Sequence, residues 1–214
     1  MIKIAPSILS ADFANLERDI QRISTADYVH VDVMDGMFVP NISIGIPVVK
    51  ALRPVTSLPL DVHLMIDRPI RYAEEFIKAG ADWLTIHLES DQPQNTLACL
   101  DKIRALGCKA AISLKPKTPA EAAIPYLAKC DMVLVMTVEP GFGAQKFMAD
   151  MMPKVKKIRR MLDEVNPACI IEVDGGVDAV TYRTCRENGA EALVTGSAYF
   201  KAADRAAFVK TLRA

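Results

Sequence analysis

Short apolar segments alternate with longer segments of helical character along the whole chain. The apolar segments predict strands at residues 2–9, 28–34, 59–65, 83–88, 109–115, 132–138, 170–174 and 192–196. The segments between them predict helices at residues 12–23, 45–53, 69–79, 94–106, 119–129, 147–164, 178–188 and 204–213. Prolines near several predicted first turns, and glycines at predicted ends such as Gly80, Gly107 and Gly189, support these boundaries.

Eight strands, each followed by a helix, predict an α/β fold with a parallel sheet and right-handed crossovers. Eight is the number of strands that closes such a sheet into a (β/α)8 TIM barrel. No linker or low-complexity tract divides the 214 residues, so we expect one domain over residues 1–214. A doubly wound open sheet is the alternative, but no G-x-G-x-x-G follows the first predicted strand.

Side chains alternate between the two faces of a strand, so each predicted strand can be divided into two faces. In residues 28–34 the valines occupy one face, and His30, Asp32 and Met34 occupy the other. The segments at 59–65 and 170–174 divide in the same way, into apolar and polar faces. Because helices cover the outside of a barrel, the apolar faces are expected outside and the polar faces inside.

Four of these inward positions carry residues that bind metals: His30, Asp32, His63 and Asp174. Two imidazoles and two carboxylates at one barrel mouth suit a divalent transition metal. We expect Zn²⁺ first, and Fe²⁺, Mn²⁺ and Co²⁺ are also chemically acceptable. The alternative is that the four groups only hydrogen-bond one another; their clustering at strand ends favours the metal. The third inward histidine, His87, is expected to be a hydrogen-bonded interior residue rather than a ligand.

Glycine-containing segments follow the last three predicted strands. They are Gly141-Phe142-Gly143-Ala144, Gly175-Gly176 and Gly196-Ser197. Small residues let backbone N–H groups approach an anion, and barrels of this kind often bind phosphate beside strands seven and eight. We therefore expect a phosphate site here, although these glycines could also serve only to form tight turns.

Two further sets of residues have two interpretations each. Met34, Met65 and Met136 share the inward face near strand ends, where they either fill the core or form an apolar collar around a bound intermediate. Lys115 ends the fifth predicted strand, and a partly solvated charge or salt bridge is favoured there over a Schiff-base lysine.

Composition narrows the class of protein. The chain has 26 basic and 26 acidic residues, so its balanced charge gives no reason to expect nucleic acid or an anionic membrane as a partner. The N-terminus has no signal-peptide pattern, and the apolar segments are too short to span a membrane. Five cysteines without a C-x-x-C pair are typical of a reduced compartment. We expect a cytoplasmic globular protein.

A metal between two carboxylates, beside a phosphate site, suits removal of a proton next to a carbonyl group. If Asp32 and Asp174 lie on opposite faces of a planar intermediate, a proton leaves one face and another returns on the other. The product is then inverted at one carbon. Epimerisation is a natural outcome of this arrangement, but not a unique one.

Six stretches of the chain resemble one family over nearly its whole length. They are APSILSADFANL, HVDVMDGMFVPN, DVHLM, MTVEPGFGAQKF, EVDGGV and VTGSA, and the family is that of ribulose-phosphate 3-epimerases. The resemblance implies a TIM barrel of the ribulose-phosphate-binding type and an isomerase of the pentose phosphate pathway. That enzyme interconverts D-ribulose 5-phosphate and D-xylulose 5-phosphate. It also implies one divalent metal per subunit and a cytoplasmic homo-oligomer.

Carried over by position, the resemblance implies His30, Asp32, His63 and Asp174 as metal ligands. In one direction Asp32 would accept the proton and Asp174 would donate one. Substrate contacts would come from Ser7, His63, Gly141, Phe142, Gly143, Ala144, Gly175, Gly176, Gly196 and Ser197.

Two positions depart from the family pattern. Met37 stands where a basic residue or histidine is common, and Ala144 replaces a glycine. The added methyl at 144 leaves the backbone N–H able to donate to phosphate if φ is negative.

Three other functions remain open. The first is 3-epimerisation of a six-carbon substrate such as allulose 6-phosphate. The second is a phosphate-binding aldolase or decarboxylase, for which the expected D-x-K-x-x-D motif is missing from this sequence. The third is an inactive sugar-phosphate binding protein.

Overall fold

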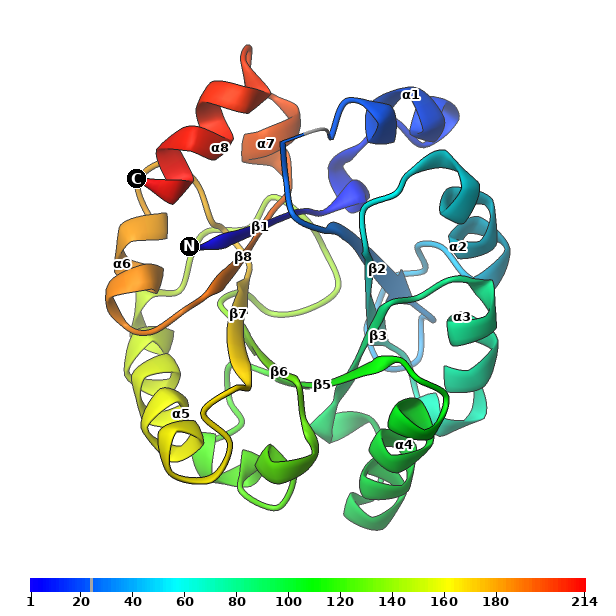
Figure 1. Cartoon of the computed structure of the whole chain (residues 1–214), viewed down its shortest axis with the longest axis vertical. Helices are drawn as coiled ribbons and strands as arrows, with labels where there is room; N and C mark the ends of the chain where they lie inside the picture. The colour runs from blue at the N-terminus through cyan, green and yellow to red at the C-terminus, as the bar shows by residue number, and fades with distance from the viewer. Residues whose placement is uncertain (24) are drawn as a thin grey trace.

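The computed structural model describes residues 1–23 and 25–214. Eight parallel strands surround a central axis in a nearly closed barrel, and the helices lie outside it (Figure 1). The strands are β1 (Lys3–Pro6), β2 (Val29–Met34), β3 (Leu60–Met65), β4 (Trp83–His87), β5 (Lys109–Leu114), β6 (Met132–Met136), β7 (Ile170–Asp174) and β8 (Ala192–Thr195). The predicted α/β barrel is therefore confirmed.

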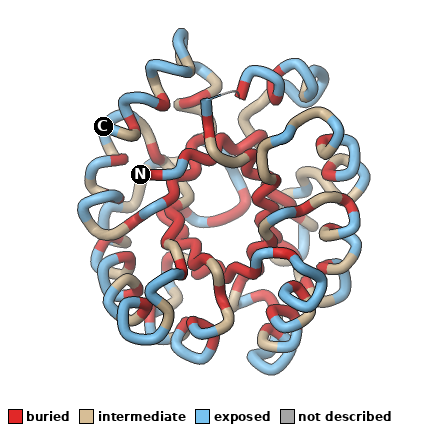
Figure 2. The backbone as a smooth tube through the Cα atoms, in the orientation of Figure 1, coloured by how far each residue is buried: buried red, intermediate tan, exposed pale blue. Residues whose placement is uncertain are grey.

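Among the described residues, one α-helix follows each strand except β5, which no α-helix follows, and β8, which two follow. The α-helices are α1 (Leu16–Gln21), α2 (Ile46–Leu52), α3 (Ala73–Ala79), α4 (Pro93–Ala105), α5 (Met152–Val165), α6 (Tyr182–Glu187), α7 (Ser197–Phe200) and α8 (Arg205–Arg213). Burial follows this arrangement: the strands form a buried ring, and the outward faces of the helices are exposed (Figure 2). The main core lies between the outer strand faces and the helices. None of the described helices has the length and apolar character needed to cross a bilayer.

Strand register brings the chemically active residues to one level inside the barrel. Asp32 on β2 pairs with His63 on β3, and Met136 on β6 pairs with Asp174 on β7. All four lie at or near the C-terminal ends of their strands. The site therefore forms at the mouth where active sites of this architecture are built.

The closure between β1 and β2 is the weakest part of the barrel wall. The ladders run from β1 through β8 and on down to β2, so β1 and β2 are the two ends of the sheet. They join through the bridge between Ser7 and His30, and through the N–H groups of Asp27 and Tyr28, which donate to the Ile4 carbonyl. This closure places Ser7 beside the site.

The predicted element boundaries need correction at several positions. The first strand ends at Pro6 rather than residue 9, because the Ser7 hydroxyl accepts from the Leu9 N–H and turns the chain into a 3₁₀ turn. The helices predicted from residues 12, 147 and 178 begin at Leu16, Met152 and Tyr182. Short 3₁₀ turns precede the first two.

The helix predicted at 119–129 is wrong. Two 3₁₀ turns, Ala120–Ala123 and Leu127–Lys129, take its place. Pro125 lies between them, where it lacks the N–H that a continuous helix would need. The short helix α7 was not anticipated, because a single turn carries too little periodicity to detect.

Four carboxylates tie the base of the barrel in a repeated arrangement. Each precedes an even-numbered strand and accepts from a backbone N–H in the preceding odd-numbered strand. The pairs are Asp27 with Ile4, Asp82 with Leu60, Asp131 with Ala110 and Glu191 with Ile171. Each carboxylate also forms an ion pair with a lysine or arginine. We call these four contacts the basal ties.

Replacing Asp27 by asparagine tests the tie at the weakest closure. Its carboxylate accepts from Ile4 N–H at 2.9 Å and from Arg213 Nη2 at 2.6 Å. Burial raises the pKa of Asp27, but these hydrogen bonds outweigh burial and hold the pKa below its usual range. We expect Asp27→Asn to lower the free energy of unfolding by about 1–2 kcal/mol at neutral pH.

A depressed pKa contributes stability above the unfolded-state pKa, and that stability is lost as pH falls through the folded-state pKa. The difference between Asp27→Asn and the parent in denaturant unfolding should therefore shrink toward acid pH. Asp101→Asn is the matched control, because Asp101 makes an exposed ion pair with Lys129. An equal loss in both variants, or a loss independent of pH, would contradict the role given to Asp27.

Candidate active site

Four side chains converge at the inner end of the barrel mouth: His30, Asp32, His63 and Asp174. One ligand atom from each lies within 4.8 Å of the other three. His30 Nε2 is 3.3 Å from Asp32 Oδ1 and 4.0 Å from Asp174 Oδ2. His63 Nδ1 is 3.3 Å and 3.7 Å from the same two oxygens. The two nitrogens and two oxygens therefore face a common centre, and they can hold a metal ion.

The chemistry of His30 supports this conclusion. Its Nδ1 lies 2.6 Å from Asp61 Oδ2, so that nitrogen carries the proton and donates it to the carboxylate. Its Nε2 is buried and has no hydrogen-bond partner within the described structure. A buried nitrogen lone pair without a partner is costly, and a cation at the common centre would satisfy it. The four residues therefore fit a divalent metal.

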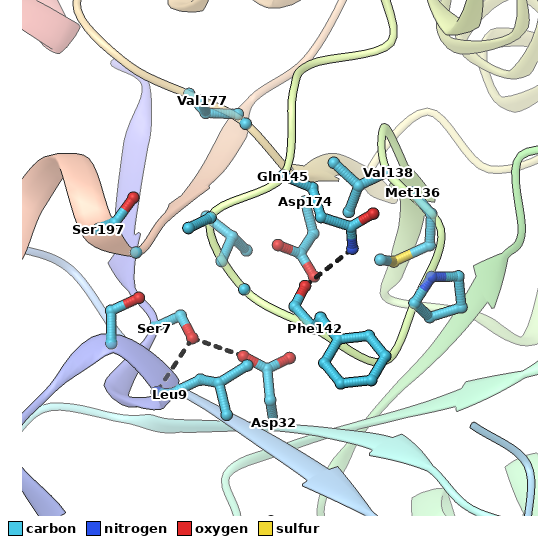
Figure 3. A pocket seen from close by; sticks show the side chains of 18 of the residues that line it. Ser7, Leu9, Asp32, Met136, Val138, Phe142, Gln145, Asp174, Val177 and Ser197 are labelled. Atoms are coloured by element: carbon cyan, nitrogen blue, oxygen red, sulfur yellow. Dashed lines mark hydrogen bonds between the residues drawn. The ribbon is translucent and has the colours of Figure 1, made fainter. Parts of the chain in front are cut away.

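Asp32 presents its two oxygens to different partners. Ser7 Oγ donates to Oδ2 at 2.5 Å, and the Leu9 N–H donates to the same hydroxyl (Figure 3). Oδ1 is left facing the two histidines. Ser7 therefore fixes the rotation of the carboxylate and its position in the site.

The two aspartates have opposite pKa shifts. Burial raises the pKa of Asp174 to about 6, and the negative charge of Asp32 adds to this effect. Burial also acts to raise the pKa of Asp32, but the adjacent His30 and His63 rings outweigh burial and hold that pKa below its usual range. The pKa of Asp174 therefore lies closer to neutral pH than the pKa of Asp32, and the two carboxyls differ in proton affinity, as a pair of acid–base groups requires.

A cavity of about 230 Å³ opens above the two aspartates. Asp32 enters it from β2 and Asp174 from β7, and these strands are separated in the barrel by β1 and β8 (Figure 3). The two histidines are fully buried below the cavity. The wall contains Met34, Met65 and Met136, which are also nearly fully buried. The cavity therefore has carboxylates at its base and an apolar wall.

The glycine segments expected to bind phosphate line the same cavity, together with Ser7 and Ser197. Gly175 and Gly176 have φ values of +121° and +66°. A Cβ at either position would lie 2.5 Å from Val138 or Phe147. These two glycines are therefore required by the packing of the turn itself, whether or not an anion binds there.

The segment after β6 forms the outer rim of the cavity. Its Gly141, Phe142, Gly143 and Ala144 all line the opening, and Phe142 is largely exposed. Asn41 Nδ2 donates to the Gly141 carbonyl, which joins this rim to the segment after β2. Ala144 has a φ of +57°, so the negative φ under which its N–H was expected to donate to phosphate is not found. The backbone at Ala144 therefore adopts a left-handed conformation that favours glycine over a residue with a side chain.

His87 and Lys115 lie outside the ligand cluster. His87 is fully buried, and its ring nitrogens approach His63 and Glu89 at 2.9 Å and 3.1 Å. Burial lowers the pKa of His87 to about 4, so the ring is neutral. The Lys115 ammonium lies 3.7 Å from the centre of the Phe38 ring, in a cation–π contact.

Sequence reasoning missed two kinds of residue. Asp61, which orients His30, shares the inward face of β3 with His63, so its parity was a usable signal. Lys201 is the one cation among the described residues that line the cavity. It follows Ser197 by four residues, and this spacing places both on one side of a helical turn.

Solved structures support the fold. A crystal structure of 3-hexulose-6-phosphate synthase aligns with a TM-score of 0.72 and 21% identity, covering 99% of this chain and 98% of the other. At this identity the likeness shows the barrel architecture alone.

Sequence comparison is more specific. The chain is 49% identical to ribulose-phosphate 3-epimerase of Bacillus subtilis (strain 168), over 100% of this chain and 99% of that protein. It is 47% identical to the Mycobacterium tuberculosis (strain ATCC 25618 / H37Rv) protein of the same name, over 98% of this chain and 91% of the other. The profile of the "Ribulose-phosphate 3 epimerase family" matches residues 3–200. The chain therefore belongs to the ribulose-phosphate 3-epimerase family.

Proposed function

We propose that this chain interconverts D-ribulose 5-phosphate and D-xylulose 5-phosphate by inverting C3, with residues 1–214 acting as one catalytic domain. The observation that carries the proposal is the pair Asp32 and Asp174. They reach one cavity from different walls of the barrel, and their pKa values are shifted in opposite directions. Such a pair can serve as a base on one face of a substrate and an acid on the other.

In one direction the Asp32 carboxylate takes the proton from C3, and the electron pair of that C–H bond moves toward the C2 carbonyl. The sugar fragment becomes a planar enediolate. Asp174, carrying a proton, then donates it to the opposite face of C3. The reaction leaves Asp32 protonated and Asp174 ionised, and the reverse reaction starts from that state. Ser7 holds Asp32 in place through its hydrogen bond.

His30, Asp32, His63 and Asp174 would hold the metal, for which we propose Zn²⁺ because two imidazoles and two carboxylates suit it. A bound divalent ion supplies positive charge beside the oxygens on which negative charge develops. The surrounding methionines, Met34, Met65 and Met136, exclude water from the reacting carbon.

The phosphate group would lie at the other end of the cavity, toward Gly175, Gly176, Gly196 and Ser197. These residues line the cavity and have no bulky side chains, so backbone N–H groups are open to an anion. Lys201 adds a positive charge at that end. We further propose that the enzyme is a cytoplasmic homo-oligomer, in line with the family resemblance of its sequence.

The proposal is tested by following C3 in deuterated water. Each pentulose phosphate, incubated with the protein, is expected to gain one deuterium at C3 as the other epimer forms, measured by NMR. Allulose 6-phosphate, assayed in parallel, is expected to give a lower kcat/KM. Conversion without deuterium uptake at C3, or a preference for the hexose phosphate, would contradict the proposal.

A further inference from the structure

The two proposed histidine ligands face the metal centre through different nitrogens. His30 uses Nε2, and His63 uses Nδ1. A histidine binds a metal through an unprotonated nitrogen, so its single proton lies on the other one. For His30 that proton is donated directly to the Asp61 carboxylate. For His63 the proton must lie on Nε2, which contacts no carboxylate in the described part of the chain.

The neighbour of His63 Nε2 is another histidine. Nε2 of His87 lies 2.9 Å away, the ring centres are 5.0 Å apart, and the ring planes are inclined by 24°. This geometry is that of two rings joined edge to edge by one N–H···N hydrogen bond. Only one proton fits between the two nitrogens. Because His63 supplies it, His87 must accept, and the proton of His87 must lie on its Nδ1.

Nδ1 of His87 points to a carboxylate. Glu89 Oε2 lies 3.1 Å from it and can accept its proton. The other oxygen, Oε1, accepts from the Lys115 N–H at 2.8 Å and from the Thr118 hydroxyl. These two contacts hold Glu89 beside the residues that follow β5, with Oε2 facing His87. Glu89, His87 and His63 thus form a continuous row of hydrogen-bonded groups. The centre of the Phe38 ring lies 4.9 Å from the centre of the His87 ring, so Phe38 packs against His87.

We propose that Glu89 and His87 are positioning residues which fix the tautomer of His63 so that Nδ1 is free to bind the metal. The proposal rests on the metal site of the proposed function. Asp61 orients His30 through a direct hydrogen bond. Glu89 would orient His63 in the same way, but through the neutral ring of His87 that lies between them. Partners that orient a metal-binding histidine typically contribute about 10–100-fold to metal affinity.

The first experiment measures Zn²⁺ affinity by competition with a chromophoric chelator, without reference to activity. His87→Leu removes the acceptor and is expected to weaken Zn²⁺ binding about 10–100-fold. Glu89→Gln removes the charge and is expected to weaken it less. His87→Gln offers a carbonyl oxygen to the His63 proton and is expected to recover part of the loss. The control Thr85→Val alters a buried interior hydroxyl on the same strand and is expected to bind as the parent does.

The second experiment reads the tautomers by ¹⁵N NMR of the Zn²⁺-loaded parent protein. We expect the proton of His63 on Nε2 and that of His87 on Nδ1. A proton on Nε2 of His87 would overturn the proposal, and so would parental Zn²⁺ affinity in both His87→Leu and Glu89→Gln. If the parent itself does not bind Zn²⁺, the metal site of the proposed function fails too. If the parent binds Zn²⁺ and the variants bind it with the same affinity, the metal site stands and only the positioning role of Glu89 and His87 fails.

Discussion

Replacement of Asp174 by asparagine is expected to lower kcat by about 10²–10⁴-fold while substrate binding remains measurable. Asparagine keeps the shape of the side chain and an oxygen that can face the metal, but it cannot carry a proton between the cavity and C3. Burial is the main cause that raises the pKa of Asp174 to about 6, closer to neutral pH than its usual value, which suits a group that must both gain and lose a proton. Steady-state kinetics in both directions measure the loss.

The same variant distinguishes the role of Asp32 from the role of Asp174. Asp32 is intact in Asp174→Asn, so the epimer whose C3 proton faces Asp32 should still exchange it with deuterated water, and the other epimer should not. Asp163→Asn is the matched control, because Asp163 is exposed, pairs with Arg159 on α5 and does not line the cavity. Turnover near the parental rate, or equal exchange from both epimers, would show that the scheme with two carboxylates is wrong.

Removal of the metal is the second change with a large expected effect. Stripping the protein with a chelator is expected to reduce activity to background, because the two aspartates would then face a developing negative charge with no cation beside it. The stripped protein should also unfold at a lower temperature than the loaded one, since a ligand that binds only the folded state stabilises it. Metal analysis, activity and thermal unfolding on the same sample measure these effects.

Adding ions back identifies what the site prefers. Zn²⁺, Fe²⁺, Mn²⁺ and Co²⁺ are each expected to restore activity, whereas Mg²⁺ and Ca²⁺ are expected to restore little, because hard cations prefer oxygen ligands to imidazole. His30→Gln, with one nitrogen donor lost, should need a higher concentration of any of these ions. Full activity in a sample verified to be free of metal would exclude the proposed role of the ion.

Strand alternation explains why so much of the site could be predicted from sequence. Side chains repeat every second residue on a strand, and a barrel has only one inside. The positions of His30, Asp32 and His63 along their strands therefore predict that their side chains point into the barrel. Neighbouring parallel strands in register then brought Asp32 beside His63.

The parts that were missed depend on information that local periodicity does not carry. The contact between His63 and His87 joins β3 to β4, and its donor is determined only once the metal-facing nitrogen of His63 is known. Pro125 was a local signal that the helix predicted at 119–129 could not continue. The positive φ of Ala144 was not predicted either, because alanine rarely adopts this conformation and its residue type gives no sign of it.

The basal ties divide the barrel into four quarters. Each tie joins an odd-numbered strand only to the even-numbered strand that follows it, so none of the strand N–H groups that donate to these carboxylates lies in a different quarter from its acceptor. A break in the polypeptide between β4 and β5 would leave two complete quarters on each fragment, with every tie intact. The fold is therefore suited to being split at that point and reassembled from two halves, because each half keeps its own basal ties and only the β4–β5 and β1–β8 ladders have to form between the fragments.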